Sequence, residues 1–300
     1  MTTAAKQAAR TGSRPVRIRA FAKINLSLQV LGVRPDGYHE IRTTFQTIAL
    51  HDTLSFVASP GPFEIRCSDP ACPVDRANLV YRAAELVWRA AGRRGPPEGV
   101  CARIRKRIPM QSGLGGGSSD AAAALRALAA IWRVKIGPAQ LKRLARTLGA
   151  DVPFFLDGGA ALGVNRGDRL RPLADAPASW VVLVLPDFGV STKDAYAWWD
   201  ERKTGRASGS LDAHRVTGND LEAPVAARYP EISKIAAALH EAGASRAAMS
   251  GSGSAVFGLF ETRRIALAAA RTLAGRACRT LVTRTLDRAS VGERARPESG

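Results

Sequence analysis

The segment 109–120, which reads PMQSGLGGGSSD, holds the residues of this chain that are best suited to bind an anion. Its glycines carry no Cβ, so backbone N–H groups can approach a phosphate closely. An alanine-rich run follows at 121–128. A helix that begins there would point its unpaired N–H groups and the positive end of its dipole at the same place. This combination predicts a phosphate-binding loop at a helix N-terminus.

Two common phosphate-binding motifs do not match this loop. The pattern G-x-x-x-x-G-K-[ST] requires a lysine after its last glycine, and the segment contains no lysine. The dinucleotide pattern G-x-G-x-x-G fails because Ser118 stands where its last glycine would be. We therefore expect a different class of nucleotide site, in which the positive charge comes from elsewhere in the chain.

The periodicity of apolar residues indicates the elements that hold this loop. Every even position of 18–30 is apolar, which predicts a long, half-buried strand. A strand over 100–108 leads into the loop, and a helix over 118–132 follows it, with Ser119 or Asp120 as its N-terminal cap. Further elements expected in this half are helices at 78–91 and 138–148 and a hairpin at 158–173.

A change of composition at 174–179, just before an apolar strand, predicts a boundary between two lobes. The second half then has the order strand, helices, two strands, helix, strand, which is typical of a split βαβ layer. We therefore expect an α+β protein with an N-terminal domain over 16–178 and a C-terminal domain over 179–289. Disordered tails are expected at 1–15 and 290–300.

Composition narrows the class of protein. The chain has 300 residues and is 46% hydrophobic, which suffices for the core of one large or two ordinary domains. No run approaches the roughly 18 apolar residues that a membrane span needs, and the N-terminus lacks the apolar region of a secretory signal. A cytoplasmic location is therefore expected. The four cysteines show no zinc-ligand spacing and are interpreted as core thiols.

The net charge of +18 raises the alternative of a basic nucleic-acid-binding protein. Only eight of the 44 basic residues are lysine, and the arginines are scattered apart from the run RIRKR at 103–107. We interpret the charge as a compositional bias and expect neither a nucleic acid nor a membrane as a partner. The expected partner is a small-molecule substrate, and the chain is expected to be a monomer or a homodimer.

Several segments together resemble the GHMP small-molecule kinases. They are PMQSGLGGGSSDAAAAL from 109, AFAKINLSLQVLGVRPDGYHEI at 20–41, NLVYRAA at 78–84, LGADVPFFL at 148–156 and SGSGSAVFGLF at 250–260. The glycine loop alone indicates only the superfamily. AKINL together with PDGYH and GADVPFF is similar to the branch that transfers phosphate from ATP to the 2-hydroxyl of a cytidine-diphosphate sugar alcohol, in non-mevalonate isoprenoid synthesis. A GHMP kinase of the homoserine or mevalonate type is the nearest alternative.

The resemblance implies a two-lobed GHMP kinase fold, with a ribosomal-protein-like α+β domain followed by a split-βαβ, ferredoxin-like domain. It also implies ATP and Mg²⁺. In that fold, Ser119 would help to place the metal. The residues implied to bind ATP are Pro109, Met110, Gln111, Ser112, Gly113, Leu114, Gly115, Gly116, Gly117, Ser118, Ser119, Asn78 and Lys106.

The same resemblance implies the residues around the acceptor. Lys23 would neutralise charge near the transferred phosphoryl group, and Asp151 would accept the proton of the acceptor hydroxyl. Tyr38 and His39 would hold the cytosine, with Tyr196 or Trp198 as a second stacking face. The residues implied to bind the acceptor are Asn25, Tyr38, His39, Thr192, Tyr196, Gly251 and Ser252.

Several of these residues also have a plainer interpretation from the sequence alone. Lys23 lies on the polar face of the first predicted strand, where a lysine is usually solvated. Asp151 precedes Val152 and Pro153, a pattern typical of a helix N-cap with proline in the first turn. Asp120 is interpreted as a first-turn residue that complements the helix dipole.

Overall fold

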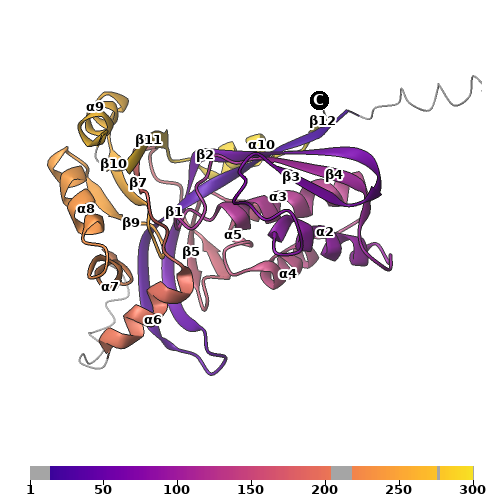
Figure 1. Ribbon diagram of the computed structural model, residues 1–300, viewed down its shortest axis with the longest axis horizontal. Coiled ribbons are helices and arrows are strands. Elements are labelled where there is room, and N and C mark those ends of the chain that lie inside the picture. The colour runs from indigo at the N-terminus through magenta and orange to yellow at the C-terminus, as the bar shows by residue number, and fades with distance from the viewer. Residues whose placement is uncertain (1–13, 204–217, 276–277, 300) are drawn as a thin grey trace, which may run out of the picture.

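Each lobe of the molecule is built on one sheet (Figure 1). The computed structural model describes residues 14–203, 218–275 and 278–299. In this part of the chain, the larger sheet has the order β12 (Glu298–Ser299), β1 (Val16–Val33), β2 (His39–Pro62), β4 (Glu98–Arg105) and β3 (Glu64–Cys67). Attached beside this path are β5 (Ala160–Val164), β6 (Arg169–Pro172) and β8 (Gly218–Asn219).

Strand β1 explains how the chain brings polar residues into a buried position. At its start, Arg17 and Arg19 are exposed while Ile18 is buried, so the alternation predicted from the sequence is confirmed there. From Ala20 to Asn25 every residue is buried. Two core clusters meet at this stretch, one within the first lobe and one shared with the second lobe. A strand that is covered on both faces buries its polar positions as well as its apolar ones.

Helices cover one face of the larger sheet (Figure 1). Helix α3 (Gly116–Ile131) packs on β1 and β2 through a run of alanines at 121–124, whose small side chains let the helix approach the sheet closely. The predicted helices at 78–91, 118–132 and 138–148 are confirmed with small shifts of their ends. The helices between β3 and β5 are α2 (Leu79–Ala90), α3 (Gly116–Ile131), α4 (Pro138–Leu148) and α5 (Phe154–Asp157).

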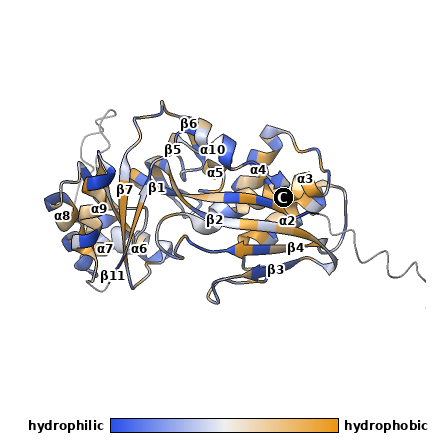
Figure 2. Ribbon diagram, turned by 90° about the horizontal axis from the view of Figure 1, so that it is seen from above, coloured by the Kyte–Doolittle hydropathy of each residue, from blue (hydrophilic) through white to orange (hydrophobic). Residues whose placement is uncertain are grey.

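The smaller sheet has the order β11 (Cys278–Arg284), β7 (Trp180–Pro186), β10 (Val256–Phe260) and β9 (Arg246–Met249), all antiparallel. Its central strand β7 is apolar along its length, as Figure 2 shows. The order of elements is the one predicted for a split βαβ layer. The helices of this lobe are α6 (Thr192–Lys203), α7 (Glu222–Ala226), α8 (Glu231–Glu241) and α9 (Arg263–Leu273). Among the described residues, no helix has the length and apolar character that crossing a membrane requires.

The structure corrects the expected disordered tail at 290–300. Helix α10 (Arg288–Arg294) is capped by Asp287, whose carboxylate accepts the N–H of Ser290 at 2.6 Å, and Val291 packs against Phe21. β12 then pairs with the start of β1. An apolar contact and a helix cap thus order a segment that reads as polar in the sequence. A disordered tail was also expected at 1–15, and residues 1–13 of this segment lie outside the described part of the chain.

The expected boundary near 178 falls just before β7, and the exact limits of the two domains stay a prediction. The first half of the chain also contributes to the second lobe, because Leu28, Val30 and Ile41 belong to its core. The β1–β2 hairpin therefore joins the two lobes instead of belonging to one of them.

Candidate active site

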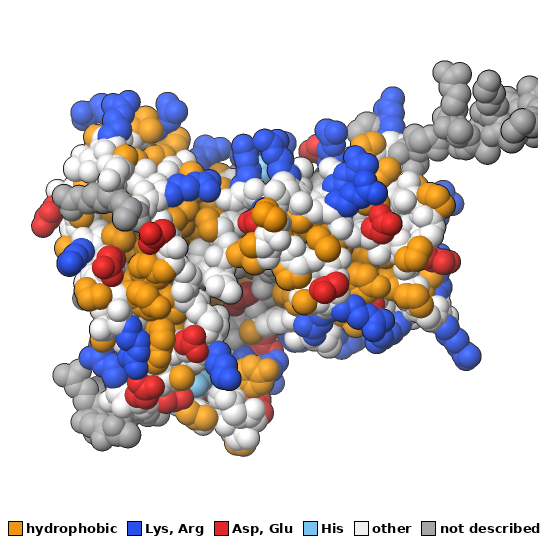
Figure 3. Space-filling model, in the orientation of Figure 1, with side chains coloured by type: hydrophobic (Ala, Val, Ile, Leu, Met, Phe, Trp, Pro, Cys, Tyr) orange, Lys and Arg blue, Asp and Glu red, His pale blue; other side chains and the backbone are white. Residues whose placement is uncertain are grey.

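A cleft of about 1020 Å³ separates the two lobes, and Figure 3 shows it as a hollow near the middle of the visible face. The glycine loop lines one side, and residues of β1, α6 and the loop 250–254 line the others. Most of the residues that the sequence assigned to ATP or to the acceptor lie around this one cleft. Leu114 and Ser119 are the exceptions, since their side chains point elsewhere.

The glycine loop has the backbone conformation that its sequence predicts. Gly113 and Gly115 both have φ of +73°, in the left-handed region that favours glycine. Gly115 is the N-cap of α3, so neither Ser119 nor Asp120 caps the helix as the sequence suggested. The side chain of Leu114 is fully buried and anchors the loop in the core. The first N–H groups of α3 therefore open toward the cleft side of the loop.

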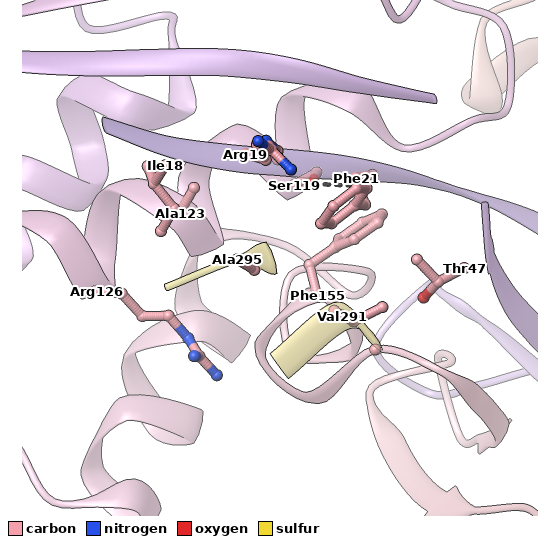
Figure 4. Close-up of a pocket in the computed structure, with 12 residues that line it drawn as sticks. Ile18, Arg19, Phe21, Thr47, Ser119, Ala123, Arg126, Phe155, Val291 and Ala295 are labelled. Atoms are coloured by element: carbon pink, nitrogen blue, oxygen red, sulfur yellow. Dashed lines mark hydrogen bonds between the residues drawn. The ribbon is translucent and has the colours of Figure 1, made fainter. Parts of the chain in front are cut away.

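Ser119 does not face the cleft. Its hydroxyl donates to the carbonyl oxygen of Phe21 at 2.6 Å, and its side chain is 2% exposed. Figure 4 shows it beside a separate cavity of about 20 Å³, behind the loop, which Arg126 and Phe155 also line. Such a cavity has room for about one water molecule. The expectation that Ser119 helps to hold a metal does not fit this geometry, whereas Ser118 lines the cleft.

Lys23 is buried, not solvated as its place on a polar strand face would suggest. It is 3% exposed, and its ammonium donates to Asn25 Oδ1 at 2.5 Å and to the carbonyl oxygen of Gly113 at 2.6 Å. Its Nζ lies 3.6 Å from Oδ2 of Asp151. Burial lowers the pKa of Lys23, and the charge of Asp151 opposes this shift. A positive charge, held against the glycine loop, is thus supplied from a position 90 residues upstream.

Asp151 directs its carboxylate at Lys23 and does not cap a helix. Helix α5 begins at Phe154, and its N-cap is Pro153, with no side-chain hydrogen bond at the cap. The Asp151 side chain is 33% exposed and lines the cleft beside Lys23. A carboxylate that lines the cleft beside an ammonium is placed to accept a proton from a bound hydroxyl.

At the other end of the cleft, aromatic residues of β2 and α6 meet. The rings of His39 and Tyr196 stack with centroids 4.5 Å apart and an interplanar angle of 25°. Tyr38 is 57% exposed, and it lines the cleft with them. Trp198 instead packs toward Tyr229, away from the cleft, so Tyr196 is the aromatic residue that the geometry favours.

Two residues near these aromatic rings were missed by the sequence analysis. Asp200 Oδ1 lies 3.0 Å from Nε2 of His39. It follows Tyr196 by four residues, so helical spacing could have placed it on the same face. The guanidinium of Arg166 lies 4.8 Å from the ring centre of Tyr38. This contact depends on how the β5–β6 hairpin packs on β2, and no local signal in the sequence indicates it.

The loop 250–254 forms the wall next to Lys23. Gly251 has φ of +56°, and a Cβ placed there would lie 3.1 Å from Nζ of Lys23. Ser252 reaches toward the opposite side, where its hydroxyl lies 3.1 Å from that of Thr192 on α6. Asn25 completes this corner and donates its amide to Thr43 Oγ1 at 2.7 Å. The residues assigned to the acceptor therefore come from three segments that are far apart in the sequence.

Lys106 lies beneath the glycine loop and is bound by two buried carboxylates. Its ammonium contacts Asp52 at 2.5 Å and Asp120 at 2.8 Å. Burial acts to lower the pKa of Lys106, but the charges of Asp120 and Asp52 outweigh burial and raise the pKa above its ordinary value. Asp120 thus neutralises a lysine, which the sequence analysis did not foresee. Asn78 lies nearby and caps α2 by accepting the N–H of Val80 at 2.9 Å.

Family comparisons agree with this architecture. The family described as "GHMP kinases N terminal domain" matches residues 78–159, and "GHMP kinases C terminal" matches residues 203–279. A protein of Pelotomaculum thermopropionicum named 4-diphosphocytidyl-2-C-methyl-D-erythritol kinase is 46% identical to this chain. The similarity covers 89% of this chain and 97% of that relative.

Solved structures show the same relationship. A crystal structure of 4-(cytidine 5'-diphospho)-2C-methyl-D-erythritol kinase is 37% identical, with a TM-score of 0.75, and covers 90% of this chain and 98% of that one. The homoserine kinase of Cytophaga hutchinsonii has a TM-score of 0.64 at 20% identity, over 90% of this chain and 95% of that one. At that identity the likeness concerns the fold alone. The similarity extends through both lobes and so includes both walls of the cleft.

Proposed function

This chain belongs to the GHMP kinases, in the family of the 4-diphosphocytidyl-2-C-methyl-D-erythritol kinases, and from this premise we propose its reaction and the roles of its residues. The protein is an ATP-dependent small-molecule kinase. It transfers the γ-phosphoryl group of ATP to the 2-hydroxyl of 4-diphosphocytidyl-2-C-methyl-D-erythritol, giving the 2-phosphate and ADP. The product is a precursor in the non-mevalonate isoprenoid pathway.

The observation that carries the assignment of roles is the pairing of Lys23 with Asp151 against the glycine loop. Phosphoryl transfer needs positioning and charge stabilisation more than covalent chemistry from the protein. ATP binds with its phosphates along 109–118, where the α3 N-terminus and the Lys23 ammonium favour negative charge. Lys23 stabilises charge that develops between the donor phosphate and the acceptor oxygen. The hydrogen bond from the Lys23 ammonium to the carbonyl oxygen of Gly113, at 2.6 Å, keeps the positive charge of Lys23 beside the loop.

Asp151 accepts the proton of the acceptor hydroxyl. An alcohol has a pKa far above the ~3.9 of an aspartate, so Asp151 does not ionise the hydroxyl beforehand. In a loose transition state the proton can move late, and the position of the carboxylate contributes more than its basicity. The transfer is direct, with no covalent enzyme intermediate.

The acceptor lies with its cytosine at the aromatic end of the cleft. Tyr38 and Tyr196 offer ring faces, and His39 offers a hydrogen-bonding edge, which is the usual way in which a base is held. Asn25, Thr192, Gly251 and Ser252 bind the sugar alcohol between this end and Lys23. The contact of His39 with Asp200, at 3.0 Å, supports this role because it orients the ring.

Magnesium fits the donors at the phosphate end of the cleft. Mg²⁺ prefers hard oxygen ligands and usually takes one or two from the protein, with water and phosphate oxygens for the rest. The hydroxyl of Ser118 and the carboxylate of Asp151 are oxygen donors that line the cleft. When bound, the metal neutralises negative charge on the phosphates of ATP. We also propose a cytoplasmic location, a monomeric or homodimeric state, and no nucleic acid or membrane partner.

The test is to incubate the protein with ATP, Mg²⁺ and 4-diphosphocytidyl-2-C-methyl-D-erythritol and to measure acceptor-dependent ADP. Homoserine and mevalonate serve as competing acceptors and should give no ADP above background. In Asp151→Asn, turnover should be abolished while ATP still binds, because the substitution keeps the shape of the side chain. Undiminished turnover in that variant would rule out Asp151 as the base.

A further inference from the structure

The segment 218–222, to which the proposed reaction assigns no role, connects the two walls of the cleft. Asn219, in β8, is the register partner of Leu28 in β1. The next residue, Asp220, donates its N–H to the carbonyl oxygen of Leu28 at 2.9 Å and accepts the N–H of Val30 at 2.8 Å. One backbone bond and one bond to the Asp220 carboxylate therefore fix the segment to the strand that carries Lys23.

The side chain of Asn219 holds the loop at the opposite wall. Its Nδ2 donates to the carbonyl oxygens of Met249 and Gly251, both at 2.8 Å, and its Oδ1 accepts the N–H of Leu221 at 3.0 Å. Asn219 is only 9% exposed, so these bonds are shielded from water. Glu222 adds a further bond, since its carboxylate accepts the N–H of Met249 at 2.8 Å.

The loop held in this way passes next to the reacting groups. A Cβ at Gly251 would lie 3.0 Å from Oδ1 of Asn25 and 3.1 Å from Nζ of Lys23. The neighbouring Ser250 accepts the N–H of Asn25 at 3.2 Å and donates its hydroxyl to the carbonyl oxygen of Gly113 at 3.0 Å. A shift of this loop would therefore move one wall of the cleft beside Lys23. The acceptor hydroxyl would then bind at the wrong position relative to the Lys23 ammonium.

We propose that Asn219 is a positioning residue for phosphoryl transfer, which acts by fixing the backbone of Met249 and Gly251 relative to β1. It touches neither ATP nor the reacting atoms in this arrangement. An asparagine suits the position because it supplies two N–H donors to two carbonyl oxygens while its own oxygen caps the following turn. The role rests on the kinase activity proposed above.

Two variants test the role. Asn219→Ala removes both donors, and Asn219→Asp keeps the shape but sets carboxylate oxygens against the two carbonyl oxygens. We expect kcat/KM for the acceptor to fall by about tenfold to a hundredfold in Asn219→Ala, since a displacement of about 1 Å near the chemistry has effects of this size. Asn219→Asp should lose more. The dissociation constant of ATP should stay close to the wild-type value, because the glycine loop is bonded to β1 through Lys23 and Leu114 as well as to Ser250.

Thr262→Ala is the matched control. Thr262 lies in the same lobe and accepts the N–H of Ile265 as the N-cap of α9, outside the cleft lining. Its loss should lower the melting temperature and leave kcat/KM unchanged. If Asn219→Asp fails to fold, Asn219→Ser replaces it in the test. Its hydroxyl keeps one donor, so its loss of kcat/KM should be smaller than that of Asn219→Ala, and ATP binding should stay normal.

Wild-type kcat/KM in a folded Asn219 variant would overturn the proposal. It would also be overturned if ATP affinity fell in parallel with acceptor turnover, because the whole cleft would then have been disturbed. Absence of acceptor-dependent ADP from the wild-type protein is a separate outcome. It refutes the proposed function before any variant is compared.

Discussion

Replacing Gly113 by alanine tests whether the glycine loop must lie directly against the loop 250–253. A Cβ at Gly113 would lie 1.9 Å from the carbonyl oxygen of Ser250, whereas real Cβ atoms essentially never approach such an atom within 3.0 Å. The two backbones must therefore separate by about 1.1 Å. In addition, alanine at a φ of +73° costs about 1–2 kcal/mol of backbone strain.

The separation reaches the chemistry because the carbonyl oxygen of Gly113 accepts the ammonium of Lys23 at 2.6 Å. A misplacement of about 1 Å at a reacting group lowers the rate by about a hundredfold, or about 2.7 kcal/mol of transition-state stabilisation. We expect kcat/KM of Gly113→Ala to fall by at least this factor. Gly292→Ala is the control, since a Cβ there has no atom within 4 Å and the position lies in helix α10, outside the cleft lining.

The assay is acceptor-dependent ADP formation at varied ATP and acceptor concentrations, with a thermal melt of each variant. Gly292→Ala should keep wild-type kinetics, and alanine should if anything stabilise the helix. A Gly113→Ala protein that is folded and as active as Gly292→Ala would contradict the prediction, because the clash with Ser250 would then have no effect on the cleft.

Three other predictions concern charge, acceptor binding and stability. Burial lowers the pKa of Lys23, with Asp151 opposing, so its charged form is lost as the pH rises through a value below 10.5. On the alkaline side of the pH profile, kcat should therefore begin to fall below pH 10.5. In Lys23→Arg this fall in kcat should shift to higher pH, and an unshifted fall would contradict the role of Lys23. Tyr38→Ala should raise the acceptor KM by about tenfold through lost stacking and leave the ATP KM unchanged; an unaltered acceptor KM would exclude stacking. Asp52→Ala leaves two backbone N–H groups without their buried acceptor and removes one of the two carboxylates that hold Lys106. It should lower the free energy of unfolding by about 3–5 kcal/mol in urea titrations; a loss below about 1 kcal/mol, as at an exposed ion pair, would contradict this prediction.

Contiguous motifs were the part of the site that the sequence could predict. A glycine loop followed by a helix binds anions through its own backbone, so its chemistry follows from local residues alone. The strand over 18–30, the helix at 78–91 and the hairpin at 158–173 were likewise local and are confirmed. Local hydrogen bonds and side-chain periodicity are enough to determine such elements.

The surroundings of two other polar residues could not be predicted, for a different reason. Asp52 reads as an isolated acidic residue, yet it is fully buried and accepts from Lys106 and from the N–H groups of Arg107 and Ile108. Ser119 looks like a cap or a metal ligand, but its hydroxyl is used by the Phe21 carbonyl of a neighbouring strand. In each case the partner is far away in the sequence, and periodicity carries no information about it.

Residue types and short spacings are enough to predict a phosphate-binding loop without its own lysine, two α+β lobes, and motifs that mark a kinase family. Which charges face that loop depends on contacts between distant parts of the chain. Lys23 is a buried ammonium at the cleft and not a solvated lysine because β1 passes between the lobes and is covered on both faces. Long-range packing sets burial, and burial decides whether a polar side chain meets water or another residue.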